Sequence, residues 1–277
     1  MRSLLALSFL PLLVVGKGNA QAKPDQARVR TAPADKAELA AITARGRALA
    51  AYDAAAWYGS DAVKALNPPE ENMGIYLGNR SDQGWVMGFG RLNDAKDAFL
   101  LAFEAVPTQD VTHPSVIAHH PMIEDREVWF HEALAFDKFR SELTGHGRPY
   151  NLAVTPAPNG NWFVYSYPAQ TDLAVFPYGG DTRFTVSADG VSPLATHKMH
   201  MSILENKKPK GVAVEMTYRT SFLDDAPEDS DVSSVLMMGH IPMLVVGKNF
   251  VYRVEEDGTA NYVTTTKALL EDAGKAK

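Results

Sequence analysis

Residues 150–167, YNLAVTPAPNGNWFVYSY, carry the strongest fold signal of the chain. Two runs rich in β-branched and aromatic residues, Tyr150–Thr155 and Trp162–Tyr167, flank the dipeptide Asn159-Gly160. Asn-Gly favours the tight turn whose backbone twist matches that of two antiparallel strands. The segment therefore predicts a β-hairpin, and the rest of the C-terminal half repeats this pattern.

Two further hairpins are expected, at Asp189-Gly190 and at Asp257-Gly258, because both dipeptides suit tight turns. The strand-like runs of this half are Arg183–Ser187, His200–Leu204, Val212–Phe222, Phe250–Val254 and Tyr262–Thr265. A short helix is predicted over Val232–Met238, and the last dozen residues resemble a fraying helix.

The N-terminal half begins with a helix. Asp35 and Glu38 have the spacing of a capping box, and apolar residues follow at helical intervals. This pattern predicts a helix from Asp35 to Trp57, or as far as Leu66, which ends before Pro68 because proline lacks the backbone donor.

Three apolar runs separated by turn residues follow this helix and predict an antiparallel meander. The runs are Gly74–Leu77, Trp85–Leu92 and Phe99–Val106. Residues 107–121 are expected to form a loop, and Ile123–Leu143 a second helix.

The fold class is therefore α+β, with antiparallel sheets built from hairpins, a long N-terminal helix and a second helix before the C-terminal strand-rich half. We expect a signal peptide (1–22), a flexible leader (23–34), a helix–meander–helix region (35–145), a strand-rich region (146–266) and a tail (267–277). Residues 35–266 as one domain are the alternative.

The first 22 residues have the pattern of a secretory signal peptide. Arg2 precedes the apolar run Leu4–Val15, and small residues lead to Ala20-Gln21-Ala22. Cleavage is predicted between Ala22 and Lys23, which places the mature chain in the periplasm or outside the cell. The apolar run is shorter than the roughly 20 residues of a membrane span, and no later stretch supplies a transmembrane segment.

The amino-acid composition excludes several kinds of site and binding partner. The chain has no cysteine, so disulfides, thiolate metal sites and cysteine nucleophiles are excluded. The formal net charge is −6, and it becomes −8 when Arg2 and Lys17 leave with the signal peptide. An acidic protein repels the phosphate backbone, so nucleic acid is not expected as a partner.

The segment that begins at Arg148 resembles a family of exported bacterial proteins without an assigned activity. The resemblance covers the C-terminal half, is looser elsewhere, and implies the periplasmic address but no chemistry. It is carried by Arg148–Asn151, Trp162–Tyr165, Tyr167–Gln170, Gly179–Asp181, Ser187–Gly190 and His200–Glu205.

A fainter pattern resembles a degenerate JAMM/MPN metalloprotease domain, in which a His-x-His pair and an aspartate complete a zinc site. Asp231 stands where the family aspartate would, but the histidine positions hold Tyr218 and Thr220, and Glu228 replaces the serine. Tyrosine and threonine are not usual zinc ligands. The resemblance therefore implies a metal-free, inactive copy.

Clustered histidines suggest a metal site. His113, His119, His120 and His131 lie close in sequence, with Glu124, Asp125 and Glu132 as further carboxylates. The alternative is a polar loop followed by one helix-surface imidazole. The candidate polar or metal cluster over the whole chain comprises His113, His119, His120, His200 and Asp231.

Two other groups each have two interpretations. His197, Met199, His200 and Met201 suit copper, or else are core methionines with surface histidines on opposite faces of a strand. The acidic loop suits calcium, or else caps the following helix. Its members are Asp224, Asp225, Glu228, Asp229 and Asp231.

The sequence holds no G-x-S-x-G or S-x-x-K nucleophile motif and no complete nucleotide-binding loop. No catalytic residue, metal ligand or cofactor is therefore assigned. The leading hypothesis is an exported, non-catalytic protein that binds a protein or small ligand in the cell envelope. The alternative is a metal-dependent, peptidase-like hydrolase acting there.

Overall fold

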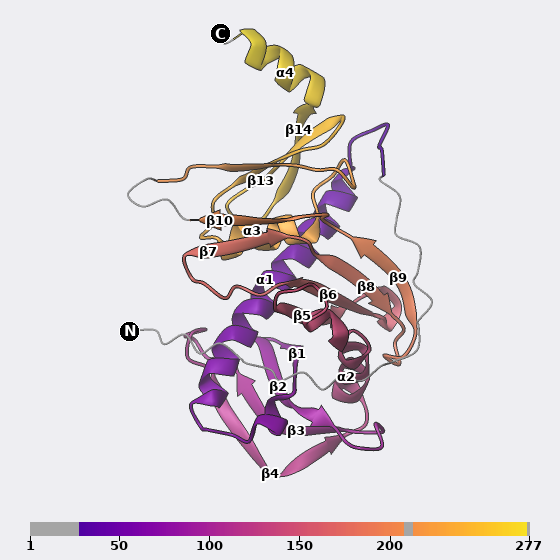
Figure 1. Ribbon diagram of the computed structural model, residues 1–277, viewed down its shortest axis with the longest axis vertical. Helices are drawn as coiled ribbons and strands as arrows, with labels where there is room; N and C mark the ends of the chain where they lie inside the picture. Colours follow the sequence, from indigo (N-terminus) through magenta and orange to yellow (C-terminus); the bar gives the residue numbers. More distant parts are fainter. Residues whose placement is uncertain (1–27, 208–212, 276–277) are drawn as a thin grey trace.

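The computed structural model describes residues 28–207 and 213–275 of the chain. In this part, four α-helices and fourteen strands form the α+β fold that the sequence predicts (Figure 1). The helices are α1 (Lys36–Lys64), α2 (Val128–Lys138), α3 (Asp229–Met237) and α4 (Thr266–Lys275). Short 3-10 helices span Glu70–Met73, Arg140–Leu143 and Pro158–Gly160.

The strands form four sheets. The first is the meander β1 (Ile75–Ser81), β2 (Gly84–Leu92), β3 (Phe99–Val106) and β4 (Ser115–Asp125). The second contains β5 (Tyr150–Pro156), β6 (Trp162–Pro168), β8 (Thr182–Val186) and β9 (Pro193–Lys198). The third contains β11 (Thr217–Thr220), β12 (Met243–Val246), β13 (Phe250–Val254) and β14 (Ala260–Thr265). A two-stranded ribbon pairs β7 (Val175–Gly179) with β10 (Ile203–Lys207). Among the fourteen strands of the described residues, only β11 and β12 pair in parallel.

Helix α1 runs past the first sheet, the second sheet and α3 (Figure 1). The Asp35 carboxylate caps its first turn by accepting a hydrogen bond from the Glu38 amide at 2.8 Å, which confirms the predicted start. Its 29 residues span about 43 Å at the usual rise per residue. One helix can therefore contact cores that lie at opposite ends of the molecule.

Three apolar cores lie along α1 or beside it. Leu39 and Ile42 pack with α3 and the third sheet, and Leu49 and Tyr52 pack between the first and second sheets. A third core joins β1 and β3 to α2, β5, β6 and β8. Residues on both sides of the predicted boundary near Gly145 therefore share all three cores.

The predicted hairpins at 159–160 and 257–258 are confirmed. Asn159 and Gly160 both have positive φ, 62° and 74°, as the expected turn requires, and β5 pairs with β6 from Pro156 opposite Trp162 onward. Gly258 has φ 83° between β13 and β14. These turns set the register of the paired strands in the second and third sheets.

The segment between residues 107 and 143 differs from the prediction. Most of the expected loop is the long edge strand β4, which tolerates Pro121 because its outer edge needs no ladder hydrogen bond. The helix expected from Ile123 begins only at Val128, since Ile123 still pairs with Leu101 in the sheet. The Asp125 carboxylate then accepts the Phe130 amide at 3.0 Å and turns the chain into α2.

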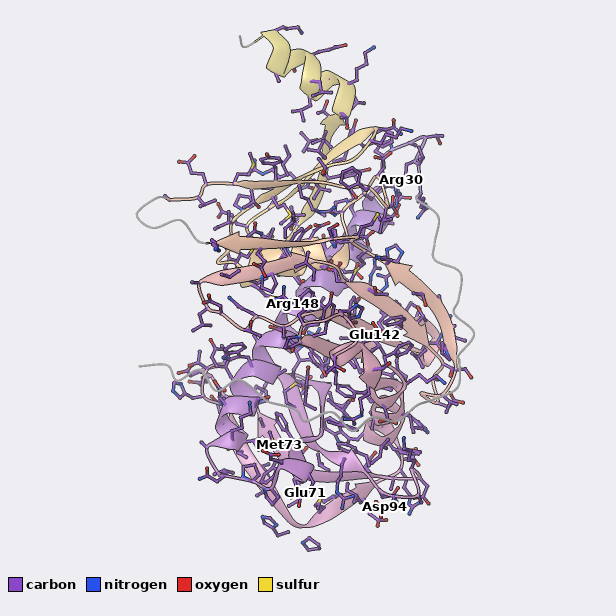
Figure 2. All side chains as sticks on the ribbon, viewed as in Figure 1. Arg30, Glu71, Met73, Asp94, Glu142 and Arg148 are labelled. Atoms are coloured by element: carbon purple, nitrogen blue, oxygen red, sulfur yellow. The ribbon has the colours of Figure 1, made fainter. Side chains whose placement is uncertain are left out.

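The described part of the expected flexible leader is held in place, which corrects that prediction for residues 28–34. The Arg30 guanidinium contacts the Glu38 carboxylate at 2.6 Å and the Asp224 carboxylate at 2.6 Å. The Ala34 amide donates to the Tyr252 hydroxyl at 2.8 Å. Figure 2 shows Arg30 beside the start of α1, at the end of the molecule that holds the third sheet.

The predicted signal peptide and its cleavage site at Ala22 and Lys23 lie outside the described residues. Among the helices described, none combines the length and the apolar character that a membrane crossing requires.

The crossing of α1 and α3 depends on Gly46. A Cβ atom at this position would lie 2.4 Å from the Val232 Cβ and 2.5 Å from the Asp229 carbonyl oxygen. We expect Gly46→Ala to lower the free energy of unfolding by about 1–3 kcal/mol, because overpacking outweighs the better helix propensity of alanine. Urea unfolding followed by circular dichroism measures this change.

Gly274→Ala is the matched control, because Gly274 is also helical and a Cβ there would meet no atom within 4 Å. This substitution should leave stability unchanged or raise it by up to about 1 kcal/mol. Equal effects of the two substitutions would contradict the close crossing.

Candidate functional site

The amino-terminal end of α3 gathers buried charged side chains from several elements. Three acids belong to α3 or cap it, and their partners come from α1, β6, β7, β8, β9, β11 and the link between β9 and β10. The members of this ionic network are Arg45, Tyr165, Tyr178, Asp181, Arg183, His197, His200, Arg219, Glu228, Asp229 and Asp231. Six of the eleven come from β7–β11 and the links between these strands, so the network ties this part of the chain to α3.

Asp231 is the centre of one branch and is fully buried. Arg219 donates to both of its carboxylate oxygens through Nε and Nη2, and Tyr178 donates its hydroxyl proton to the first oxygen. The Glu228 amide donates to the second oxygen at 2.6 Å. Burial raises the pKa of Asp231, but Arg219 and His200 lower it more, so the pKa lies well below its usual range.

His200 lies between two carboxylates. Its Nδ1 is 2.6 Å from Asp181 Oδ1, and its Nε2 is 3.0 Å from the Tyr178 hydroxyl and 3.5 Å from Asp231 Oδ1. Burial and the Arg219 charge lower the pKa of this imidazole, but the Asp181 and Asp231 carboxylates together outweigh them, and the pKa rises to about 9. His200 is therefore an imidazolium at neutral pH and donates from both ring nitrogens.

Asp229 is the centre of a second branch. Arg45 Nε donates to its two oxygens at 2.9 and 3.0 Å, the Tyr165 hydroxyl donates at 2.9 Å, and Arg183 adds a further contact. The Arg183 guanidinium also lies 4.8 Å from the ring centre of Phe163. One buried carboxylate thus joins α1, β6 and β8 to α3.

The network reaches the surface at His197. Its Nε2 lies 2.8 Å from Glu228 Oε2, and this hydrogen bond raises the pKa of His197. Glu228 and Asp231 also form a reciprocal capping box, in which each side chain accepts the other residue's amide. The spacing Glu228-x-x-Asp231 in the sequence therefore indicates where α3 begins.

The geometry does not fit a nucleophile relay. In a Ser-His-Asp set, serine and aspartate contact opposite nitrogens of the imidazole. Ser230 Oγ is 3.4 Å from Nδ1 of His200, which is the nitrogen that Asp181 already occupies, and Ser230 is buried. The protonated ring also has no free lone pair to accept a proton. The arrangement around His200 therefore does not match a Ser-His-Asp set.

The structure brings together two of the five residues of the candidate polar or metal cluster, His200 and Asp231. The other three lie elsewhere in the fold, His119 and His120 on β4 and His113 in the loop before β4. His113 contacts Asp110 at 2.8 Å, His119 contacts Glu104 at 2.9 Å, and His120 lies edge-on to a phenylalanine ring. Within residues 28–207 and 213–275, no three histidine, aspartate or glutamate side chains are placed to hold a metal ion.

The acids of the predicted acidic loop are held by protein donors. Glu228 and Asp231 cap α3, which confirms the capping interpretation for them, and Asp229 accepts the two arginines described above. Asp224 accepts Arg30, and Asp225 accepts the backbone amide and the side-chain amide of Asn249, both at 3.0 Å.

The predicted strand near His200 begins only at Ile203, so His200 lies before the strand and not on one of its faces. Met199 is 1% exposed and Met201 is 61% exposed, which separates the two thioethers of the copper hypothesis. For the JAMM/MPN resemblance, the residue that reaches Asp231 is Arg219, which lies between the two expected histidine positions.

A surface groove of about 390 Å³ lies between α1 and β14. Its lining residues are Lys36, Leu39, Ala40, Thr43, Ala44, Arg47, Thr259, Ala260 and Asn261. No sequence pattern marks these residues as a site, because they come together only where the two elements meet.

No protein-family model matches this sequence, no curated protein is significantly similar to it, and no solved structure significantly resembles its fold.

The pKa of His200 predicts how stability depends on pH. Because the folded pKa is raised from 6.5 to about 9, the contribution of His200 is complete below pH 6.5 and is lost as the pH rises through 9. This contribution amounts to about 3 kcal/mol. Urea unfolding between pH 5.5 and 9.5 should show this decline, and His200→Gln should remove most of it.

His113→Gln is the control, because the His113 side chain is 81% exposed and belongs to another part of the fold. This variant should keep the wild-type slope of stability against pH. Parallel curves for the wild type and His200→Gln would refute the imidazolium between Asp181 and Asp231.

Proposed function

We propose that this protein is an exported, non-catalytic binding protein of the cell envelope. The observation that carries the proposal is that the acids and bases around α3 are bonded to one another. The raised pKa of His200 favours its protonated form, both of its nitrogens are engaged, and the neighbouring Ser230 is buried. Such a network supports a rigid scaffold that presents a binding surface.

The groove between α1 and β14 is the candidate ligand site. Its volume lies within the range of small-molecule sites. Leu39, Ala40 and Ala44 supply apolar wall, whereas Lys36 supplies positive charge and Arg47 is paired with Asp257. This lining favours a small ligand that has an apolar body and a carboxylate or another anionic group.

The groove is held open by contacts within the protein. The Ala260 amide donates to Thr43 Oγ1 at 3.0 Å, which fixes the distance between β14 and α1. Arg47 donates to the Asp257 carboxylate at 2.8 Å and to Thr259 Oγ1 at 2.9 Å. Because these groups are already ordered, a ligand that enters has little conformational entropy to remove.

We expect thermal-shift screening against small carboxylates and acidic tri- and tetrapeptides to find a ligand that stabilises the wild type. Ala44→Trp should abolish this shift, since the indole fills the groove. Ala41→Trp is the matched control, because Ala41 lies on the exposed side of α1 outside the groove, and it should keep the shift.

A stabilising ligand that is unaffected by Ala44→Trp would contradict the assigned site. Turnover of peptide or ester substrates that is lost in His200→Gln, in a variant that still folds, would contradict the non-catalytic proposal. That result would favour the alternative of an envelope hydrolase.

The export part of the proposal rests on the pattern of residues 1–22. Expression of the full chain in a Gram-negative host, followed by fractionation and amino-terminal sequencing, should find protein in the periplasm or the medium that begins at Lys23. Protein that stays in the cytoplasm with an intact amino terminus would contradict export.

A further inference from the structure

The α1 wall of the groove is a single stripe of the helix. Its side chains run from Lys36 to Arg47 at intervals of three and four residues, which places them on one face. The helix rises about 16 Å between these two ends, which is the length of about four to five residues of an extended peptide. The groove therefore suits an elongated ligand that lies along α1.

Strand β14 runs opposite to α1 on the other wall. At one end, the Arg47 guanidinium donates to Thr259 Oγ1 at 2.9 Å. One turn earlier in α1, Thr43 Oγ1 accepts the Ala260 amide at 3.0 Å. Asn261, the next residue of β14 and also part of the lining, therefore lies towards the amino-terminal end of α1.

The end of the groove at Arg47 is balanced in charge. Arg47 Nη2 contacts the Asp257 carboxylate at 2.8 Å, and Arg47 Nε donates to the Asp257 carbonyl at 2.9 Å. The Asp257 carboxylate also accepts the amide and the hydroxyl of Thr259, both at 2.8 Å. Because these groups satisfy one another, the end of a ligand that lies here needs no charge.

The opposite end holds polar groups without a partner. Within the described residues, neither the Lys36 ammonium nor the Asn261 side-chain amide makes a hydrogen bond or an ion pair. The nearby carboxylates are engaged elsewhere, since Asp35 caps α1 and Glu38 binds Arg30. The positive end of the α1 dipole lies here as well. These features together favour a negative charge at one end of the ligand.

We propose that the groove binds the carboxyl-terminal end of an extended peptide, with the terminal carboxylate between Lys36 and Asn261. This inference rests on the proposed ligand site and names its ligand class and orientation. The Lys36 ammonium pairs with the carboxylate, and the Asn261 amide donates to the carboxylate and accepts the amide of the last peptide residue.

A peptide fits this lining better than an acyl chain. Ala40, Ala44 and Ala260 have small side chains, so a peptide backbone can approach both walls. Asn261 offers a donor and an acceptor, which a peptide group satisfies and a hydrocarbon chain does not. Lys36 is the first lining residue of α1, so the ligand's charge belongs at its end, where a terminal carboxylate lies.

Affinity selection followed by mass spectrometry tests this assignment. The probes are an equimolar library of amino-terminally acetylated tetrapeptides with free carboxyl termini and the same library with amidated termini. The wild type should bind its best acids at least tenfold more tightly than the matching amides, because amidation removes the charge that Lys36 recognises.

Lys36→Met should weaken the binding of the selected acids about tenfold and abolish the preference for acid over amide, as measured by calorimetry. Lys64→Met is the matched control, because Lys64 lies on the same helix outside the groove and its replacement removes the same charge. This variant should keep both the affinity and the preference.

Equal binding of acids and amides, lost in Ala44→Trp, would refute the carboxylate assignment and leave the groove as the binding site. Selected acids that bind Lys36→Met as tightly as the wild type would refute the position of the carboxylate. Retention of neither library would overturn the peptide class. The proposed ligand site would fall with it only if the small carboxylates of the thermal-shift screen also failed to bind.

Discussion

The ion pair between Asp231 and Arg219 is the interaction on which this fold depends. Both side chains are buried, and a buried charge without a partner costs several kcal/mol. The pair therefore requires β11 and α3 to keep their present positions. Tyr178 and His200 extend the requirement to β7 and to the link between β9 and β10. A set of polar contacts thus specifies how the central ribbon and the third sheet meet.

Helix α1 provides the second constraint. The close approach at Gly46 brings α3 against α1, and it places Arg45 where its guanidinium reaches Asp229. The same helix continues into the core between the first and second sheets, where Tyr52 is fully buried. Apolar packing and the ionic network are therefore coupled through one helix, and a change at the crossing affects both.

The sequence predicted the elements whose signals are local. Asp35 marked the start of α1, and Asn159-Gly160 marked a hairpin, because a cap and a turn each involve only neighbouring residues. Strand β4 was missed because Pro121 and the histidines around it resemble a loop when the edge position is unknown. His200 and Asp231 were named as candidates, but their partners were not. Tyr178 and Asp231 are 53 residues apart, and no local pattern encodes such a contact.

The proposed non-catalytic role requires the network to hold fixed charge and to leave no imidazole nitrogen free to accept a proton. A direct test is the pKa of the His200 imidazole in the folded protein, measured by NMR titration of the ring nitrogens. The signal is assigned as the one that is missing in His200→Gln. The account predicts a pKa of about 9, with both nitrogens protonated at neutral pH. A pKa at or below 6.5, with one nitrogen free to accept a proton, would contradict it.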